Sequence, residues 1–184
     1  MHLILQRHGD SQGTAATSVE VGLAWPAPGK LALTYVVTGD IADLKLPAPA
    51  AGGRTDELWR HTCLEAFVGA AHGAAYYEFN LAPSSEWAAY GFSGYRDGMT
   101  PVEPFDDPGV LVETKADRFV QRATLNLGDL PGLRPDLDWR LALTAVIEQR
   151  DGLKSYWALA HPAGRPDFHH ADSFSQILTP AERA

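Results

Sequence analysis

Cysteine, clustered positive charge and long apolar runs are all scarce in this chain. Cys63 is the single cysteine, so no internal disulfide can form, and we expect this side chain to be a small buried apolar group. The 15 Lys and Arg residues are scattered and outnumbered by 23 Asp and Glu, which argues against nucleic-acid or membrane-surface partners. No apolar stretch approaches the length that spans a bilayer.

A secretion signal and the common catalytic motifs are missing as well. Residues 1–8 contain too short an apolar run and are followed by no small-residue cleavage site, so we expect a cytoplasmic protein. There is no Gly-x-Ser-x-Gly elbow, no phosphate-binding glycine-rich loop and no His-Glu-x-x-His helix, so we expect no enzyme activity. The alternative is a hydrolase in which Glu65 pairs with Glu78 or Asp167, because glycoside hydrolysis needs two carboxylates.

Short segments of β-type composition fill the chain instead. With 45% hydrophobic and 21% charged residues, the 184 residues are typical of one folded domain spanning 1–184. Runs rich in Val, Thr, Tyr, Phe and Trp alternate with Gly, Pro and Asp clusters, and long helical patterns are absent. The expected strands are residues 2–8, 18–25, 30–38, 62–69, 75–82, 87–93, 109–114, 118–127, 138–149, 153–160 and 174–178. This spacing predicts an all-β fold, a two-sheet antiparallel β-sandwich of jelly-roll or immunoglobulin-like type.

The connections between these strands divide into tight turns and long loops. Turn residues at Pro28-Gly29, Ala116-Asp117 and Asp151-Gly152 predict hairpins. Three longer segments, rich in Gly, Pro and Asp, cover residues 47–58, 94–108 and 161–172. Long irregular loops on a small domain are usually functional or disordered, so we expect the function to lie in them.

Two neighbouring strands carry polar residues at alternating positions. From Thr62 onward, alternation places Cys63, Glu65 and Phe67 on one face and Leu64, Ala66 and Val68 on the other. On the next strand Glu78 and Asn80 share one face, opposite Tyr77, Phe79 and Leu81. We expect a polar strip here, and from spacing alone we expect Glu65 to be exposed.

These motifs together resemble a known family. Trp59 precedes the strand with Glu65, Asn80 ends the next strand, and Trp157 precedes a loop with Phe168 and a short last strand. From about residue 18 onward the chain resembles the DOMON-like relatives of the family 9 carbohydrate-binding modules. The resemblance implies a β-sandwich that holds a mono- or oligosaccharide between two aromatic side chains, at the positions of Trp59 and Phe168. Apolar sugar faces pack on aromatic rings, and polar groups at the edges bind the hydroxyls.

The resemblance and the loop positions together give a candidate site with no cofactor. The expected ligand-binding residues are Trp59, Glu65, Asn80, Arg96, Arg165, Asp167, Phe168 and His169. Glu65 and Asn80 match the family pattern, whereas Arg96 and Arg165 are included for their charge and their position in loops. The chain departs from the pattern at Phe168, where the family usually has Trp, and at the adjoining His169 and His170.

Three alternatives stay open at this point. A metal site would use His161, His169, His170 and Asp172, although their spacing matches no compact metal signature. A haem site would use Met99, the one internal methionine. A protein-interaction module is the third alternative, because the tryptophans can be structural: we expect Trp87, Trp139 and Trp157 in the core and leave Trp59 undecided.

Overall fold

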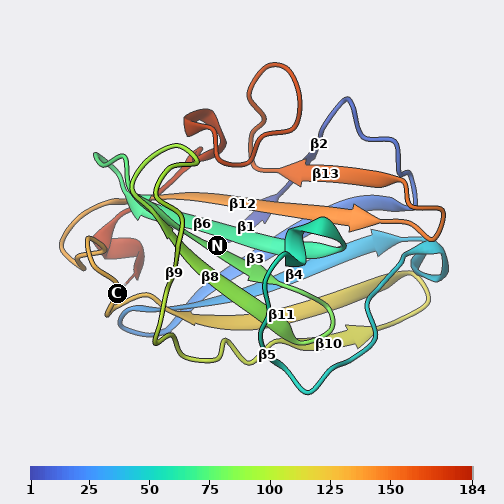
Figure 1. Cartoon of the computed structure of the whole chain (residues 1–184), viewed down its shortest axis with the longest axis horizontal. Coiled ribbons are helices and arrows are strands. Elements are labelled where there is room, and N and C mark those ends of the chain that lie inside the picture. The colour runs from blue at the N-terminus through green and yellow to red at the C-terminus, as the bar shows by residue number, and fades with distance from the viewer. Residues whose placement is uncertain (184) are drawn as a thin grey trace.

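The computed structural model describes residues 1–183, and two packed sheets of mainly antiparallel strands make up its framework (Figure 1). The smaller sheet has five strands in the order β1 (His2–Ile4), β3 (Ala16–Ala27), β4 (Lys30–Gly39), β11 (Arg118–Asn126) and β10 (Leu111–Thr114). The larger sheet has the order β2 (Gln6–Arg7), β13 (Lys154–Ala158), β12 (Trp139–Glu148), β6 (Cys63–Ala70), β7 (Tyr76–Leu81), β8 (Glu86–Phe92) and β5 (Gly53–Arg54). Two further short strands join it, β14 (Gln176–Leu178) on β12 and β9 (Thr100–Pro101) on β8. The β-sandwich expected from the sequence is confirmed.

Alternation of side chains builds the main core between the sheets. Along β4 the buried positions are every second residue from Leu31 to Val37, and β11 follows the same pattern from Phe119 to Leu125. These side chains meet the inner face of the larger sheet, which contributes Leu64, Phe79 and others. The expected core tryptophans, Trp87, Trp139 and Trp157, are all buried, as is Cys63.

The larger sheet is buried on both faces at its centre. All of β6 except its last residue is buried, and so is nearly all of β12. A second apolar cluster therefore lies on the outer face, opposite the main core. It consists of Phe67, Tyr76, Ala88, Tyr90, Phe92, Ala142 and Phe174, with Leu58, Trp59 and Phe168 packed against it. Within residues 1–183 no third sheet covers this face, so its cover comes from loops.

The predicted hairpin turns form where turn chemistry requires them. Pro28-Gly29 connects β3 and β4, with Gly29 at φ 73°, and the turn before Leu153 has Gly152 at φ 88°. A positive φ of this kind suits glycine because it has no Cβ. The turn at Ala116-Asp117 likewise joins β10 to β11.

Two sequence predictions differ from the structure in detail. The single strand expected over residues 2–8 is divided at Leu5, which is buried, and the halves β1 and β2 join different sheets. The segments expected to be irregular contain the short strands β5 and β9. Helical structure within residues 1–183 is limited to single 3-10 turns: η1 (Ile41–Asp43), η2 (Leu58–Arg60), η3 (Ala171–Ser173) and η4 (Pro180–Arg183). No helix in this part of the chain has the length and apolar character to cross a membrane.

Candidate functional site

Acidic side chains form the floor of a cavity on the outer face of the larger sheet. Glu65 on β6 lies opposite Thr144 on β12 and Asn80 on β7, so all three project to the same side. Glu65 is 2% exposed, which corrects the expectation of an exposed strand residue. The physical reason is tertiary: β6 is a central strand, and loops cover its outer face.

The floor carboxylates are only partly satisfied by hydrogen bonds. The Thr144 hydroxyl donates to Glu65 Oε2 at 2.9 Å, and the Asn80 amide donates to Glu78 Oε1 at 2.8 Å. Glu65 Oε1 is buried and has no hydrogen-bond partner among the described residues. A buried acceptor without a partner carries a desolvation cost, which a donor supplied by a ligand would remove.

Burial and mutual repulsion also change how the floor carboxyls titrate. Burial raises the pKa of Glu65, and the nearby Glu78 carboxylate raises it further. Burial likewise raises the pKa of Glu78, against the lowering effects of the Asn80 hydrogen bond and the Arg96 charge. Two buried carboxyls at close quarters do not both ionise readily, so the pair retains a proton near neutral pH.

Above the floor is a cavity of about 420 Å³ with aromatic walls. Its lining consists of Trp59, Glu65, Glu78, Phe92, Arg96, Met99, Val146, Tyr156, Pro166, Phe168 and His169. Three separate segments form the cover: residues 54–62 before β6, the hairpin tip at 93–99, and the late loop at 159–175.

Trp59 belongs to the segment before β6. It lies in the single turn η2, which the backbone bonds from Arg60 N–H to Glu57 O and from His61 N–H to Leu58 O close. Its indole meets Tyr90 edge to face, with ring centroids 5.8 Å apart. Trp59 is half-buried, so one part of its ring is anchored and another faces the cavity.

The late loop begins and ends at one edge of β12. The strand before it, β13, pairs with Thr144–Glu148, and the strand after it, β14, pairs with Trp139–Leu141. The loop is thereby held across the outer face of the sheet. It carries Phe168, whose ring lies 6.3 Å from that of Tyr156 by centroids, on the cavity wall.

His169 fills the space beside the floor in its neutral form. Burial lowers its pKa to about 4, and the Arg96 charge contributes. The Tyr76 hydroxyl accepts the Arg96 backbone N–H at 3.2 Å and lies 2.8 Å from His169 Nδ1, so we assign it as the donor to that nitrogen. The ring proton then resides on Nε2, 3.8 Å from Glu78 Oε2.

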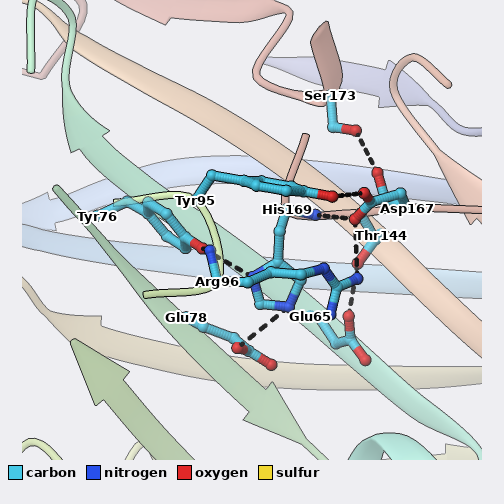
Figure 2. A network of polar contacts seen from close by, with 9 residues as sticks. All are labelled: Glu65, Tyr76, Glu78, Tyr95, Arg96, Thr144, Asp167, His169 and Ser173. Atoms are coloured by element: carbon cyan, nitrogen blue, oxygen red, sulfur yellow. Dashed lines mark hydrogen bonds and ion pairs between the residues drawn. The ribbon is translucent and has the colours of Figure 1, made fainter. Parts of the chain in front are cut away.

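Arg96 reaches the cavity from the hairpin tip and is held there by the late loop. Its guanidinium donates to Asp167 Oδ1 at 2.8 Å, and Tyr95 donates to the other oxygen of Asp167. Burial alone would raise the pKa of Asp167, but the bonds from Tyr95 and Arg96 lower it, so this carboxylate is ionised. Figure 2 shows Arg96 and His169 lying between Asp167 and the two floor carboxyls.

The structure brings most of the sequence-predicted residues together. Those that line the cavity are Trp59, Glu65, Arg96, Phe168 and His169, and Asp167 holds Arg96 from behind. Asn80 is fully buried and supports Glu78 instead of lining the cavity. Arg165 is exposed and lies outside the cavity lining.

The sequence left several cavity residues out of the candidate site. Glu78 shares its strand face with Asn80, so alternation contained a usable signal for it. The sequence contains no comparable signal for Tyr156, Phe92 and Met99, because their position on the cavity depends on which loop covers which strand.

The histidines proposed for a metal site are dispersed. His161 packs edge to face on His8 at 4.7 Å and bonds the backbone oxygen of Gln6, away from His169. The side chain of His170 accepts the backbone N–H of Asp172 at 3.2 Å. Within the described part of the chain, no three His, Cys, Asp or Glu side chains are grouped as metal ligands would be.

Comparison with known proteins finds similarity only at the level of structure. No family model and no curated protein sequence matches this chain. A candidate carbohydrate-binding protein from Bacteroides uniformis is 13% identical, with a TM-score of 0.68 over 94% of this chain and 83% of that one. A family 9 carbohydrate-binding module from Caldicellulosiruptor kristjanssonii, solved with cellotriose, is 12% identical, with a TM-score of 0.53 over 89% and 74%. The chain thus shares its β-sandwich fold with carbohydrate-binding modules of family 9.

Proposed function

We propose that this protein is a non-catalytic carbohydrate-binding domain that holds a mono- or oligosaccharide in the cavity between Trp59 and Phe168. One observation carries the proposal: these two aromatic side chains, from distant parts of the sequence, line the same cavity, and that cavity has an acidic floor. The fold shared with the cellotriose-bound module supports it.

The chemistry of the lining suits a sugar ring. Trp59, Phe92 and Phe168 supply apolar surfaces for the C–H faces of a pyranose, and Glu65 Oε1 is an acceptor that lacks a donor. Arg96 adds hydrogen-bond donors for ring hydroxyls. The cavity volume of about 420 Å³ falls within the range of roughly 300–1,000 Å³ usual for small-molecule sites.

The placement of the carboxyls supports binding rather than hydrolysis. In most glycoside hydrolases an acid and a second carboxylate flank the scissile bond from two sides. Glu65 and Glu78 project from adjacent strands on the same face of the sheet, so both would meet a ligand from the floor. Asp167 is engaged by Arg96 and Tyr95.

Sugar binding is testable through tryptophan fluorescence. Trp59 is the one tryptophan among the described residues that lines the cavity, so titration with glucose or cellobiose should change the emission. Calorimetry in parallel gives the affinity independently of the optical signal. Trp59→Ala should abolish both signals, while Trp59→Phe should weaken binding less, because it retains an aromatic surface.

A matched pair of arginine variants supplies the control. Arg96→Ala removes a cavity donor and should weaken binding, whereas Arg165→Ala removes an exposed charge from the same region and should not. An absence of response to glucose, cellobiose and cell-wall sugars would reject the proposal in favour of a protein-interaction module. Release of chromophore from aryl glycosides would contradict its non-catalytic part.

A further inference from the structure

The cavity has two acidic side chains at its floor, and no cationic side chain of its described lining forms a hydrogen bond with them. Glu65 and Glu78 occupy diagonal positions on paired strands, a relation that places two residues about 7–8 Å apart with their Cβ atoms somewhat closer. Arg96, the one cationic residue in the lining, already pairs with Asp167 at 2.8 Å, and His169 is neutral. The Arg96 charge lowers the pKa of both floor carboxyls, but its guanidinium bonds Asp167, so no cationic side chain of the described cavity lining hydrogen-bonds Glu65 or Glu78.

Apart from Arg96, the groups around the pair supply no counter-charge. Burial raises the pKa values of Tyr35, beneath the floor, and of Cys63, beside Glu65 on the same face of β6, so both are uncharged. The flanking hydroxyls are those of Tyr76, Tyr90, Thr144 and Tyr156, and Asn80 contributes an amide. Glu65 Oε1, buried and lacking a partner, is the acceptor at which a ligand cation would gain most.

We infer that the preferred ligand is an amino sugar, with its ring between Trp59 and Phe168 and its ammonium group on Glu65 and Glu78. This inference rests on the proposed function and specifies the class of saccharide. Aromatic walls favour the combination, because a ring face attracts a cation as well as apolar C–H groups. A charge-assisted hydrogen bond is roughly twice as strong as a neutral one, so D-glucosamine should bind about tenfold more tightly than D-glucose.

Binding of a cation should also displace the proton that the floor pair retains. The ammonium group stabilises the ionised form of both carboxyls, so a proton leaves Glu65 or Glu78 and passes to the buffer. The bound ammonium keeps its own protons, and no covalent bond changes. A neutral sugar gives no such stabilisation, so its binding should release far less.

The experiment is calorimetric titration of the full chain with D-glucosamine, D-glucose and N-acetyl-D-glucosamine, slightly below neutral pH. The acetylated sugar is the matched neutral control, because it keeps the nitrogen and removes the charge. Repeating the titration in buffers of different ionisation enthalpy counts the protons released. We expect up to about one proton for glucosamine and close to none for the neutral sugars.

A ring-free amine separates the sugar from its charge. Butylamine carries an ammonium group without a pyranose ring, so it should bind much more weakly than glucosamine. Equal binding of butylamine and glucosamine would overturn the amino-sugar assignment. Glucose binding as tight as glucosamine binding would overturn it too but leave the proposed function intact, whereas failure of all the sugars rejects both.

Glu65→Gln tests the acceptor directly. The substitution keeps the shape of the side chain and removes its ionisable group. The ratio of the affinities for glucosamine and glucose should therefore fall towards one, and binding should no longer release a proton. Glutamine has nearly the same shape as glutamic acid and can still accept the Thr144 hydroxyl, so the variant should fold, and circular dichroism checks it. An unchanged preference in a folded variant would contradict the inference, and the wild-type proton count provides a test that needs no variant.

Discussion

The two faces of the larger sheet are made by the same strands yet differ in what covers them. The inner face of β6 and β7 meets the smaller sheet and consists of apolar residues such as Leu64 and Phe79. The outer face meets loops and contains Glu65, Glu78 and Asn80, each at most 4% exposed. Equal burial thus has different consequences: a sheet leaves no room for an acid, whereas loops leave a cavity in which a buried acid is useful.

Removing a large side chain from the inner face should have the largest effect on stability. Phe79→Ala creates a void in the main core and should lower the free energy of unfolding by about 3–5 kcal/mol, measured by urea denaturation. Because Phe79 does not line the cavity, sugar affinity of the folded variant should be unchanged. A loss of affinity matching that of Trp59→Ala would show that the two faces are not independent.

The outer face should make stability depend on pH. The folded-state pKa values of Glu65 and Glu78 are raised above the ordinary 4.5, so the native protein binds more protons than the unfolded chain above that pH. The two carboxyls stabilise the folded protein at low pH. This stabilisation, on the order of 3 kcal/mol in the free energy of unfolding, is lost as the pH rises through the raised pKa values. Urea denaturation at about pH 5 and about pH 8 measures it.

The control for this pH dependence is the double variant Glu65→Gln, Glu78→Gln. Its stability should fall less between the two pH values than that of the wild-type protein, because neither amide titrates. If the free energy of unfolding falls equally with pH in the variant and the wild-type protein, groups other than Glu65 and Glu78 cause the pH dependence.

Loss of the hydroxyl beneath Glu65 should have a smaller effect. Thr144→Val removes the bond of 2.9 Å to Glu65 Oε2 at nearly constant volume and should lower the unfolding free energy by about 1–3 kcal/mol. At a pH above the raised pKa of Glu65, the same substitution should have a smaller effect in the background of Glu65→Gln, because a bond to an ionised partner is stronger than one to an amide. Additive effects in this double-mutant cycle would argue against direct coupling.

The smallest effect should come from the loops that cover the outer face. Asp167→Asn weakens the partly exposed pair with Arg96 and should change the unfolding free energy by at most about 1 kcal/mol, a few degrees in melting temperature. Sugar affinity should change more than stability does, since Arg96 loses its anchor. A large stability loss with unchanged affinity would reverse this expectation.

Local sequence pattern predicted the long strands well and the loops over the outer face poorly. Alternation and turn residues located the long strands, as at Lys30–Gly39 and Trp139–Glu148, because both signals act within a few residues. Burial of Glu65 was not predictable in this way, since it depends on loops distant in sequence. Family resemblance supplied Trp59 and Phe168, and the DOMON-like relationship and cytoplasmic location stay predictions.

The contrast between two arginines shows where sequence reasoning ends. Arg96 and Arg165 are equally good candidates by charge and loop position, yet of these two only Arg96 lines the cavity. The difference arises from its pairing with Asp167, 71 residues away in sequence. Nothing local to either arginine encodes that pairing.

A single phenol on β7 joins two of the covering segments. The Tyr76 hydroxyl contacts the backbone of Arg96 in the hairpin tip and the ring of His169 in the late loop. Transplanting either segment from another sandwich protein, to change which guest the pocket accepts, would therefore disturb the other. Redesign of this fold should exchange the two segments together or preserve their common anchor.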